Sequence, residues 1–140
     1  PRDPVNALLS LTYMLCLGQI IGECYARGLD PHIGFLHQLD YGRPSLALDL
    51  LEPLRPRFCD RFVLGNLQAE RFSPEDFTHS DRQGCRLGKE GFRRFINRFE
   101  AFRTKGSTRS SSLHSAIRQV VAATVSALHD SEPLNLAPLV

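Results

Sequence analysis

The sequence lacks several features that would assign it quickly to a class of protein. Its 140 residues include no tryptophan and one methionine, and its four cysteines form no CxxC pair. No histidine stands at zinc-finger spacing from a cysteine pair, which argues against a structural zinc module. Low-complexity and collagen-like stretches are absent, and 42% hydrophobic with 23% charged residues excludes wholesale disorder. The chain therefore has the size and composition of one globular domain, or of a piece of a larger protein.

Charge is absent from residues 4–22, which approach the length of a membrane span. Four polar residues interrupt this stretch, however, and no basic segment precedes it: Asn6, Ser10, Thr12 and Gln19. These features favour a buried core helix over a signal peptide, and no membrane partner is expected. Because the chain begins at Pro1 rather than methionine, we expect a processed product or an excised fragment.

The cysteines favour a reduced compartment. Two disulfides in a secreted protein are the alternative, but Cys16 and Cys59 stand among apolar residues, as buried free thiols do. We therefore expect a cytoplasmic protein.

The expected fold class is all-α, an irregular bundle of about five helices, because neither strand alternation nor a hairpin dipeptide occurs. Proline and cap signals place helices at 4–27, at 45–67 with a break at Pro53 and Pro56, and at a short segment after Ser73. Apolar periodicity adds helices at 88–103 and 112–129. Residues 79–88 are expected to form a loop and 104–111 a flexible linker. One domain then spans 1–130, with an irregular tail at 131–140.

Paired carboxylates are the first candidate site. Asp49 and Glu52 are three residues apart on an expected helix, which places both on one face. A divalent cation would relieve their repulsion, and His37 could add an imidazole nitrogen. Such a set favours Mg²⁺ or Mn²⁺. Spacing alone leaves open the alternative of a solvated helix face and an ordinary histidine.

Positive charge is concentrated in the centre of the chain. Residues 1–52 have net charge −3, residues 53–109 have +6 and residues 110–140 have −1. Within the basic segment, Arg93, Arg94 and Arg98 alternate with phenylalanines at helical spacing. They could contact DNA phosphates, or could be solvated charge on a helix whose phenylalanines pack the core. Arg43, before the Asp49 helix, is a separate candidate for binding phosphate.

An ordered series of motifs resembles a known family. The series is NALLS at 6–10, GLDP at 28–31, GFLH at 34–37 and GRPSLALDL at 42–50, followed by Glu52. Together these resemble the helical C-terminal domain of the CRISPR-associated Cas1 family of spacer-acquisition endonucleases and integrases. The resemblance covers most of the chain and weakens after about residue 104.

The resemblance implies roles for individual residues. His37 and Asp49 match residues that bind a divalent metal in the family, and Glu52 matches an acidic residue that contributes in many members. Asn6 and Ser10 match residues that pack or hydrogen-bond near the site, although polar contacts within a helix bundle would explain them equally. His37 could instead shuttle a proton.

Some family features have no counterpart here. A further glutamate ligand and the β-rich domain that makes the homodimer would precede Pro1, and the end of the chain lacks the expected aromatic residues. We therefore expect an incomplete site and a fragment that is weakly active or inactive by itself.

The implied function is CRISPR adaptation: metal-dependent cleavage and transesterification of DNA phosphodiesters that insert spacers into the array. The implied partners are double-stranded DNA, a second copy in the full-length protein, and a small ferredoxin-like CRISPR subunit. The alternative is a non-catalytic helical module that binds DNA or protein, in which Asp49 and Glu52 form ordinary ion pairs.

Overall fold

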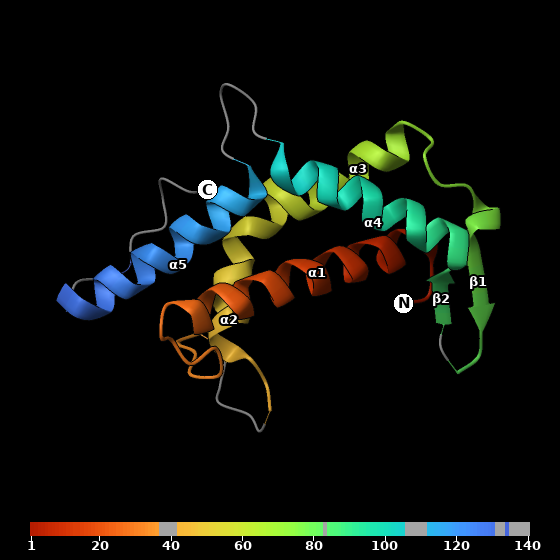
Figure 1. Cartoon of the computed structure of the whole chain (residues 1–140). Coiled ribbons are helices and arrows are strands. Elements are labelled where there is room, and N and C mark those ends of the chain that lie inside the picture. Colours follow the sequence, from red (N-terminus) through yellow and green to blue (C-terminus); the bar gives the residue numbers. More distant parts are fainter. Residues whose placement is uncertain (37–41, 83, 106–111, 131–133, 135–140) are drawn as a thin grey trace.

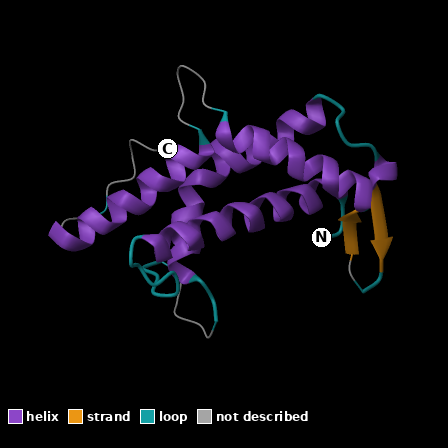
Figure 2. Cartoon of the chain, in the orientation of Figure 1, coloured by secondary structure: helices purple, strands orange, loops and turns teal. Residues whose placement is uncertain are grey.

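The computed structural model describes residues 1–36, 42–82, 84–105, 112–130 and 134. Five α-helices occur in these segments: α1 (Pro4–Ala26), α2 (Ser45–Leu51), α3 (Arg61–Gln68), α4 (Lys89–Thr104) and α5 (Leu113–Asp130). Figure 1 shows α1 running along the molecule and the segment from α2 to α3 crossing it. Helices α4 and α5 lie above α1 in this view. The mostly helical class is confirmed (Figure 2).

The N-terminal helix begins as its sequence predicts. Asp3 accepts hydrogen bonds from the backbone N–H of Asn6 (2.9 Å) and from its side-chain amide (2.7 Å), and Pro4 occupies the first turn. By length and composition alone α1 is apolar enough to cross a membrane. In the fold it packs against α2, α5 and the β2 strand, and 28% of its apolar 18-residue window is buried.

The segment after α2 shows what two prolines do to a helix. Pro53 lies in a 3₁₀ turn (Glu52–Leu54) and Pro56 in a π-helical turn (Arg55–Asp60), before α3 resumes. Neither proline can donate a backbone hydrogen bond, so the regular α pattern fails where the sequence predicts a break. The single interrupted helix expected over 45–67 is therefore α2 and α3 with two irregular turns between them, and the helix expected after Ser73 is a 3₁₀ turn (Pro74–Asp76).

The prediction of a loop at 79–88 is wrong, because part of this segment forms strands. Strands β1 (Phe77–Ser80) and β2 (Gly84–Leu87) form an antiparallel hairpin in which Phe77 pairs with Leu87 and Ser80 with Gly84. Only Phe77 of β1 is buried, so no alternation marks the strand. Tertiary contacts hold the hairpin instead: β2 packs on α1 and α4, and Cys85 donates a backbone hydrogen bond to the Pro1 carbonyl (2.9 Å).

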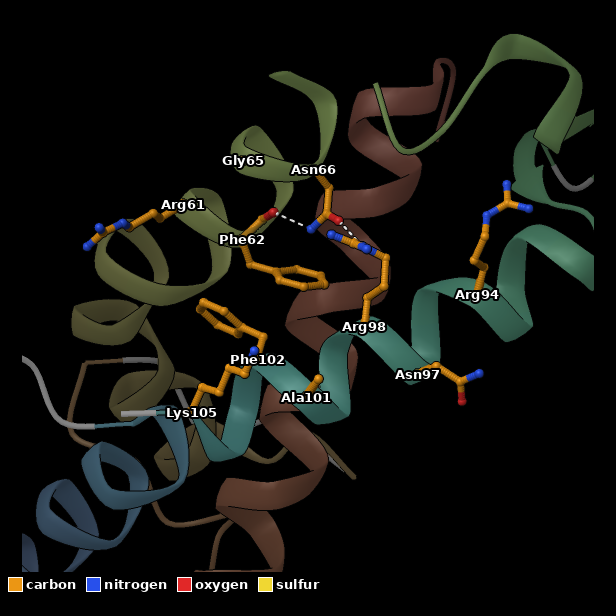
Figure 3. A pocket seen from close by; sticks show the side chains of 10 residues that line it. All are labelled: Arg61, Phe62, Gly65, Asn66, Arg94, Asn97, Arg98, Ala101, Phe102 and Lys105. Carbon is orange, nitrogen blue, oxygen red and sulfur yellow. Dashed lines mark hydrogen bonds between the residues drawn. The ribbon is translucent and has the colours of Figure 1, made fainter. Parts of the chain in front are cut away.

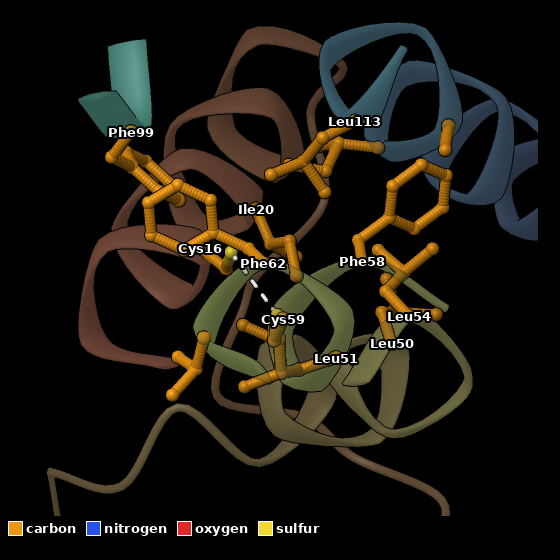
Figure 4. Close-up of a cluster of buried hydrophobic side chains, with 14 of the residues drawn as sticks. Cys16, Ile20, Leu50, Leu51, Leu54, Phe58, Cys59, Phe62, Phe99 and Leu113 are labelled. Carbon is orange, nitrogen blue, oxygen red and sulfur yellow. Dashed lines mark hydrogen bonds between the residues drawn. The ribbon is translucent and has the colours of Figure 1, made fainter. Parts of the chain in front are cut away.

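The core lies where α1, the α2–α3 segment, α4 and α5 meet (Figure 4). Phe95 and Phe99 of α4 are buried and meet Phe62 edge-on, with ring centroids 5.5 and 5.6 Å apart. Phe92, on the same helix, remains 45% exposed.

The four cysteines are free and buried: Cys16, Cys24, Cys59 and Cys85. The Cys59 thiol donates to the Cys16 sulfur (3.3 Å), and this bond together with burial raises the pKa of Cys59. Burial raises the pKa of Cys24 to about 11. These thiols therefore act as small core side chains.

Several expected segments fall partly or wholly outside the described residues. These are the linker from residue 106 to 111 and the tail, apart from Leu134. Thr104 ends α4 rather than beginning the linker.

The Asp76 side chain joins the 3₁₀ turn before β1 to α4, and a substitution at Asp76 tests this contact. Its carboxylate accepts from the Ser73 backbone N–H (2.9 Å) and pairs with Arg94 (2.5 Å). These contacts lower the pKa of Asp76, so the stabilisation is present at neutral pH and disappears as the pH falls through that lowered pKa. Asp76→Asn should lower the free energy of unfolding by about 1 kcal/mol at neutral pH. Urea unfolding at about pH 2 should show no difference from the parent, and an equal loss at both pH values would contradict this account.

Candidate metal centre and nucleic-acid surface

The candidate metal centre begins with the loop that caps α2. The Pro31 carbonyl accepts from the backbone N–H groups of Leu46 (2.9 Å) and Ala47 (3.3 Å), which are among the first amides of α2. These amides lack partners within the helix. The loop after α1 is therefore fixed against the start of α2.

Gly34 allows this loop to approach α2 closely. A Cβ atom at Gly34 would lie 2.7 Å from the Ser45 Cβ and 2.9 Å from Oδ2 of Asp49. Both distances are shorter than real Cβ contacts, so this position admits only glycine without movement of the backbone.

Asp49 fixes the end of the same loop. Its side chain is in the core, with the residue 1% exposed, and Oδ2 accepts from the backbone N–H groups of Phe35 (2.7 Å) and Leu36 (2.9 Å). Charge-assisted bonds of this kind offset the cost of burying a carboxylate. The next residue, His37, lies outside the described residues, so its predicted approach to Asp49 stays a prediction.

Glu52 lies in a different environment. Its side chain is 44% exposed and pairs with Arg55 across 2.8 Å. The helix type changes between the two carboxylates, since α2 ends at Leu51 and Glu52 opens the 3₁₀ turn. The structure thus places the two acids one turn apart, one buried and one at the surface.

Two residues on this side of the molecule were not predicted: Arg55, which pairs with Glu52, and Tyr13, which contacts Arg55. The Arg55 guanidinium lies 4.2 Å from the centre of the Tyr13 ring, and the Tyr13 hydroxyl donates to Asp60 (2.5 Å). Burial, followed by the Asp60 bond, raises the pKa of Tyr13. Arg55 could have been found from its position three residues after Glu52. The role of Tyr13 could not have been predicted from sequence spacing, because 47 residues separate Tyr13 from its partner Asp60.

The donor chemistry suits a hard cation, although the described residues do not complete a site. Carboxylate oxygens are the ligands that Mg²⁺ and Mn²⁺ prefer. Among the described residues, however, no group of three His, Cys, Asp or Glu side chains is placed to hold a metal ion. Asp49 and Glu52 can therefore supply at most part of a ligand set.

Asn6 and Ser10 lie apart from Asp49. Both are exposed in the first turns of α1, and Asn6 is bound to Asp3. Figure 1 shows α2 beside the C-terminal part of α1, away from the N-terminal turns that contain Asn6 and Ser10. Within the described residues, the Asn6 side chain is seen to hydrogen-bond to Asp3, the cap of α1.

The predicted DNA-binding arginines differ in their contacts. Arg43 and Arg93 are exposed, without an ion-pair partner among the described residues. Arg94 pairs with Asp76 and lies 5.7 Å from the centre of the Phe72 ring. Arg98 donates to the side chain of Asn66 on α3. Arg94 is therefore held by Asp76 and Phe72, and Arg98 joins α4 to α3 (Figure 3).

Comparisons with known proteins agree with this fold. The family described as CRISPR-associated protein Cas1 matches residues 1–101. A CRISPR-associated endonuclease Cas1 of Thermus thermophilus is 46% identical over 101 residues, which cover 71% of this chain and 30% of the relative.

Two solved structures have the same arrangement of helices. A Cas1 protein from Thermotoga maritima matches 96% of this chain and 43% of its own, with a TM-score of 0.82 at 27% identity. A casposase bound to its integration product matches 94% of this chain and 37% of its own, with a TM-score of 0.81 at 28% identity. This chain spans less than half of the length of each of these proteins, and it belongs to the CRISPR-associated Cas1 family.

Proposed function

We propose that this chain forms the helical part of a metal-dependent DNA endonuclease and integrase of CRISPR adaptation. The observation that carries the proposal is the buried Asp49 carboxylate, which binds the backbone of Phe35 and Leu36 immediately before His37. A carboxylate held in this way is preorganised, as catalytic ligands must be. The named activity of the Thermus relative, a CRISPR-associated endonuclease, supports the reaction class.

In the proposed site, Asp49, Glu52 and His37 would hold Mg²⁺ or Mn²⁺, together with a glutamate from outside this chain. The ion would supply Lewis-acid stabilisation of charge on the phosphoryl oxygens. Asp49 fixes the loop that leads to His37, and Arg55 restrains the Glu52 carboxylate. His37 would serve as a ligand or would move a proton from the attacking hydroxyl, a DNA 3′-OH in integration or water in cleavage.

DNA is the proposed substrate. Residues 53–109 have net charge +6, and Arg93 of α4 faces solvent without a carboxylate partner among the described residues. The casposase that shares this fold is bound to its integration product. We further propose, from the family resemblance, that the longer protein forms a homodimer and binds a small ferredoxin-like subunit.

A non-catalytic helical module is the second candidate. The Glu52–Arg55 ion pair is the observation that favours it, because that hypothesis predicts ordinary pairing of the carboxylates. Asp49 does not follow the pattern that the non-catalytic hypothesis predicts, because its carboxylate accepts hydrogen bonds from the backbone amides of Phe35 and Leu36.

A chimera separates the two candidates. Residues 1–101 of this chain, the part that matches the family, would replace the corresponding segment of the Thermus relative, which is 46% identical over 101 residues. We expect Mn²⁺-dependent cleavage of DNA by the chimera, and a loss of at least about 100-fold on Asp49→Asn. This chain alone should cleave weakly or not at all. A folded chimera in which Asp49→Asn retains full activity would support the non-catalytic candidate.

A further inference from the structure

The guanidinium of Arg55 is held between a carboxylate and an aromatic ring. Its Nη1 donates to Oε1 of Glu52 (2.8 Å), and its central carbon lies 4.2 Å from the centre of the Tyr13 ring. Contacts between a cation and a ring extend to about 6 Å, so this contact is a close one. Arg55 lies in the π-helical turn and Tyr13 on α1, so the contact joins two elements of the fold. The Arg55 side chain therefore has less freedom than a surface arginine ordinarily has.

Tyr13 is fixed in turn by Asp60. The Tyr13 hydroxyl donates to Oδ1 of Asp60 (2.5 Å), and the ring packs against the hydrophobic core. The residue before Asp60, Cys59, is buried and donates its thiol to Cys16, almost one turn after Tyr13 on α1 (Figure 4). Two adjacent contacts thus join the π-helical turn to the same stretch of α1. The ring that meets Arg55 is held in place by both.

These contacts connect an exposed carboxylate to the core. Alone, the Glu52–Arg55 pair would restrain little, because the two side chains are 44% and 36% exposed and surface pairs of long side chains are ordinarily mobile. Here the arginine is restrained by Tyr13, and Tyr13 by Asp60. The orientation of Glu52 is therefore set by contacts that reach back to α1.

The same contacts leave Glu52 able to bind a cation. The bond from Arg55 uses Oε1, and a carboxylate has two oxygens, each of which accepts more than one contact. Carboxylates that bind metals are commonly hydrogen-bonded by surrounding residues that orient them, and loss of such a partner lowers metal affinity by about 10–100-fold. A carboxylate that is already ordered also loses less conformational entropy when it binds.

We propose that Tyr13 and Asp60 are positioning residues, which act through Arg55 to hold the Glu52 carboxylate in one orientation for the divalent cation. The proposal rests on the metal site of the proposed function, in which Glu52 is a ligand. The alternative is that these contacts only hold the π-helical turn against α1.

The order of the Glu52 side chain in EDTA tests the positioning without a metal. NMR relaxation of the ¹³C-labelled side chain gives its order parameter, which we expect Arg55→Gln to lower into the flexible range, below about 0.6. Tyr13→Phe should lower it less, because phenylalanine keeps the ring and removes only the bond to Asp60. Asp60→Asn keeps an oxygen that accepts from the Tyr13 hydroxyl, so it should preserve more order than Asp60→Ala, which has the same charge.

Affinity for Mn²⁺, measured from the electron paramagnetic resonance signal of the free ion, tests whether the orientation serves a metal. Arg55→Gln separates two effects by their sign. Removing a cation beside the site strengthens Mn²⁺ binding by electrostatics alone, whereas loss of positioning weakens it. We expect binding about 10-fold weaker than in the parent. Tyr13→Phe leaves the charge unchanged and should also weaken binding. Glu52→Gln defines the part of the binding that depends on this carboxylate.

The Arg27–Glu23 pair is the matched control. It is an ion pair of the same chemistry, with an N–O distance of 2.7 Å, four residues apart on α1. Arg27→Gln removes one cation, as Arg55→Gln does, and should leave both the order of Glu52 and the affinity for Mn²⁺ nearly unchanged. Circular dichroism checks that each variant is folded. If Arg55→Gln is unfolded, the milder Tyr13→Phe decides the outcome.

Two results would overturn the proposal. One is a Glu52 side chain as ordered in Arg55→Gln and Tyr13→Phe as in the parent. The other is unchanged or tighter binding of Mn²⁺ by variants that unfold at lower temperature, which would assign the contacts to packing alone. A parent chain that binds no Mn²⁺, but whose Glu52 loses order in the EDTA experiment as expected, would contradict the metal site of the proposed function and still confirm the positioning.

Discussion

Replacing Asp49 with alanine should lower the free energy of unfolding by about 3–6 kcal/mol, because two hydrogen bonds to a charged group each contribute ~1.5–3 kcal/mol. The bonds lost are those from the backbone of Phe35 and Leu36 to a side chain in the core. Urea unfolding followed by circular dichroism measures the change, and an unaltered m-value shows that the unfolded state is the same.

Glu52→Ala is the matched control for this experiment. Glu52 is also an acidic residue, one turn later, but its side chain is 44% exposed and pairs with Arg55 at the surface. Its loss should cost less than about 1 kcal/mol. Equal costs for Asp49 and Glu52 would mean that the Asp49 carboxylate is solvated, contrary to the structure.

Gly34→Ala should destabilise the chain by about 1–3 kcal/mol, because the added methyl group has no space. Its Cβ would lie 2.7 Å from the Ser45 Cβ, 2.8 Å from the Ser45 carbonyl carbon and 2.9 Å from the Asp49 carboxylate. The loop would have to move off α2, which would lengthen the bonds that hold Phe35 and Leu36. Thermal unfolding gives the stability, and hydrogen exchange at these two amides reports the loop directly.

Gly18→Ala provides a control for which the expected change in the free energy of unfolding has the opposite sign. Gly18 lies within α1, and a Cβ there would have nothing within 4 Å. Alanine is favoured over glycine in a helix by about 1 kcal/mol, so this variant should be more stable than the parent. If Gly34→Ala were also stabilising, the close approach of the loop to α2 would be wrong.

Local signals in the sequence predicted the helices well. Asp3-Pro4 begins α1, and Pro53 and Pro56 interrupt the path from α2 to α3, because caps and prolines act on the residues beside them. The hairpin was missed because its strands have four residues each and are held by contacts with α1 and α4.

The candidate site was predicted by residue type more than by geometry. Helical spacing placed Asp49 and Glu52 on one face, but α2 ends between them, so one is buried and the other exposed. The contact between Asp49 and the loop at 34–36 depends on the missing Cβ of Gly34, which no periodicity reveals. The Asn66–Arg98 bond likewise joins residues 32 positions apart.

The central claim is that Asp49 belongs to a divalent-metal site, and paramagnetic broadening tests it most directly. Mn²⁺ would be titrated into the isotope-labelled chain while amide resonances are followed by NMR. We predict that the signals of Phe35 and Leu36, whose N–H groups bind Asp49, broaden before the rest. Excess Mg²⁺ should reverse the effect, and Asp49→Asn should abolish it. Broadening that begins elsewhere, or that persists unchanged in Asp49→Asn, would contradict the account.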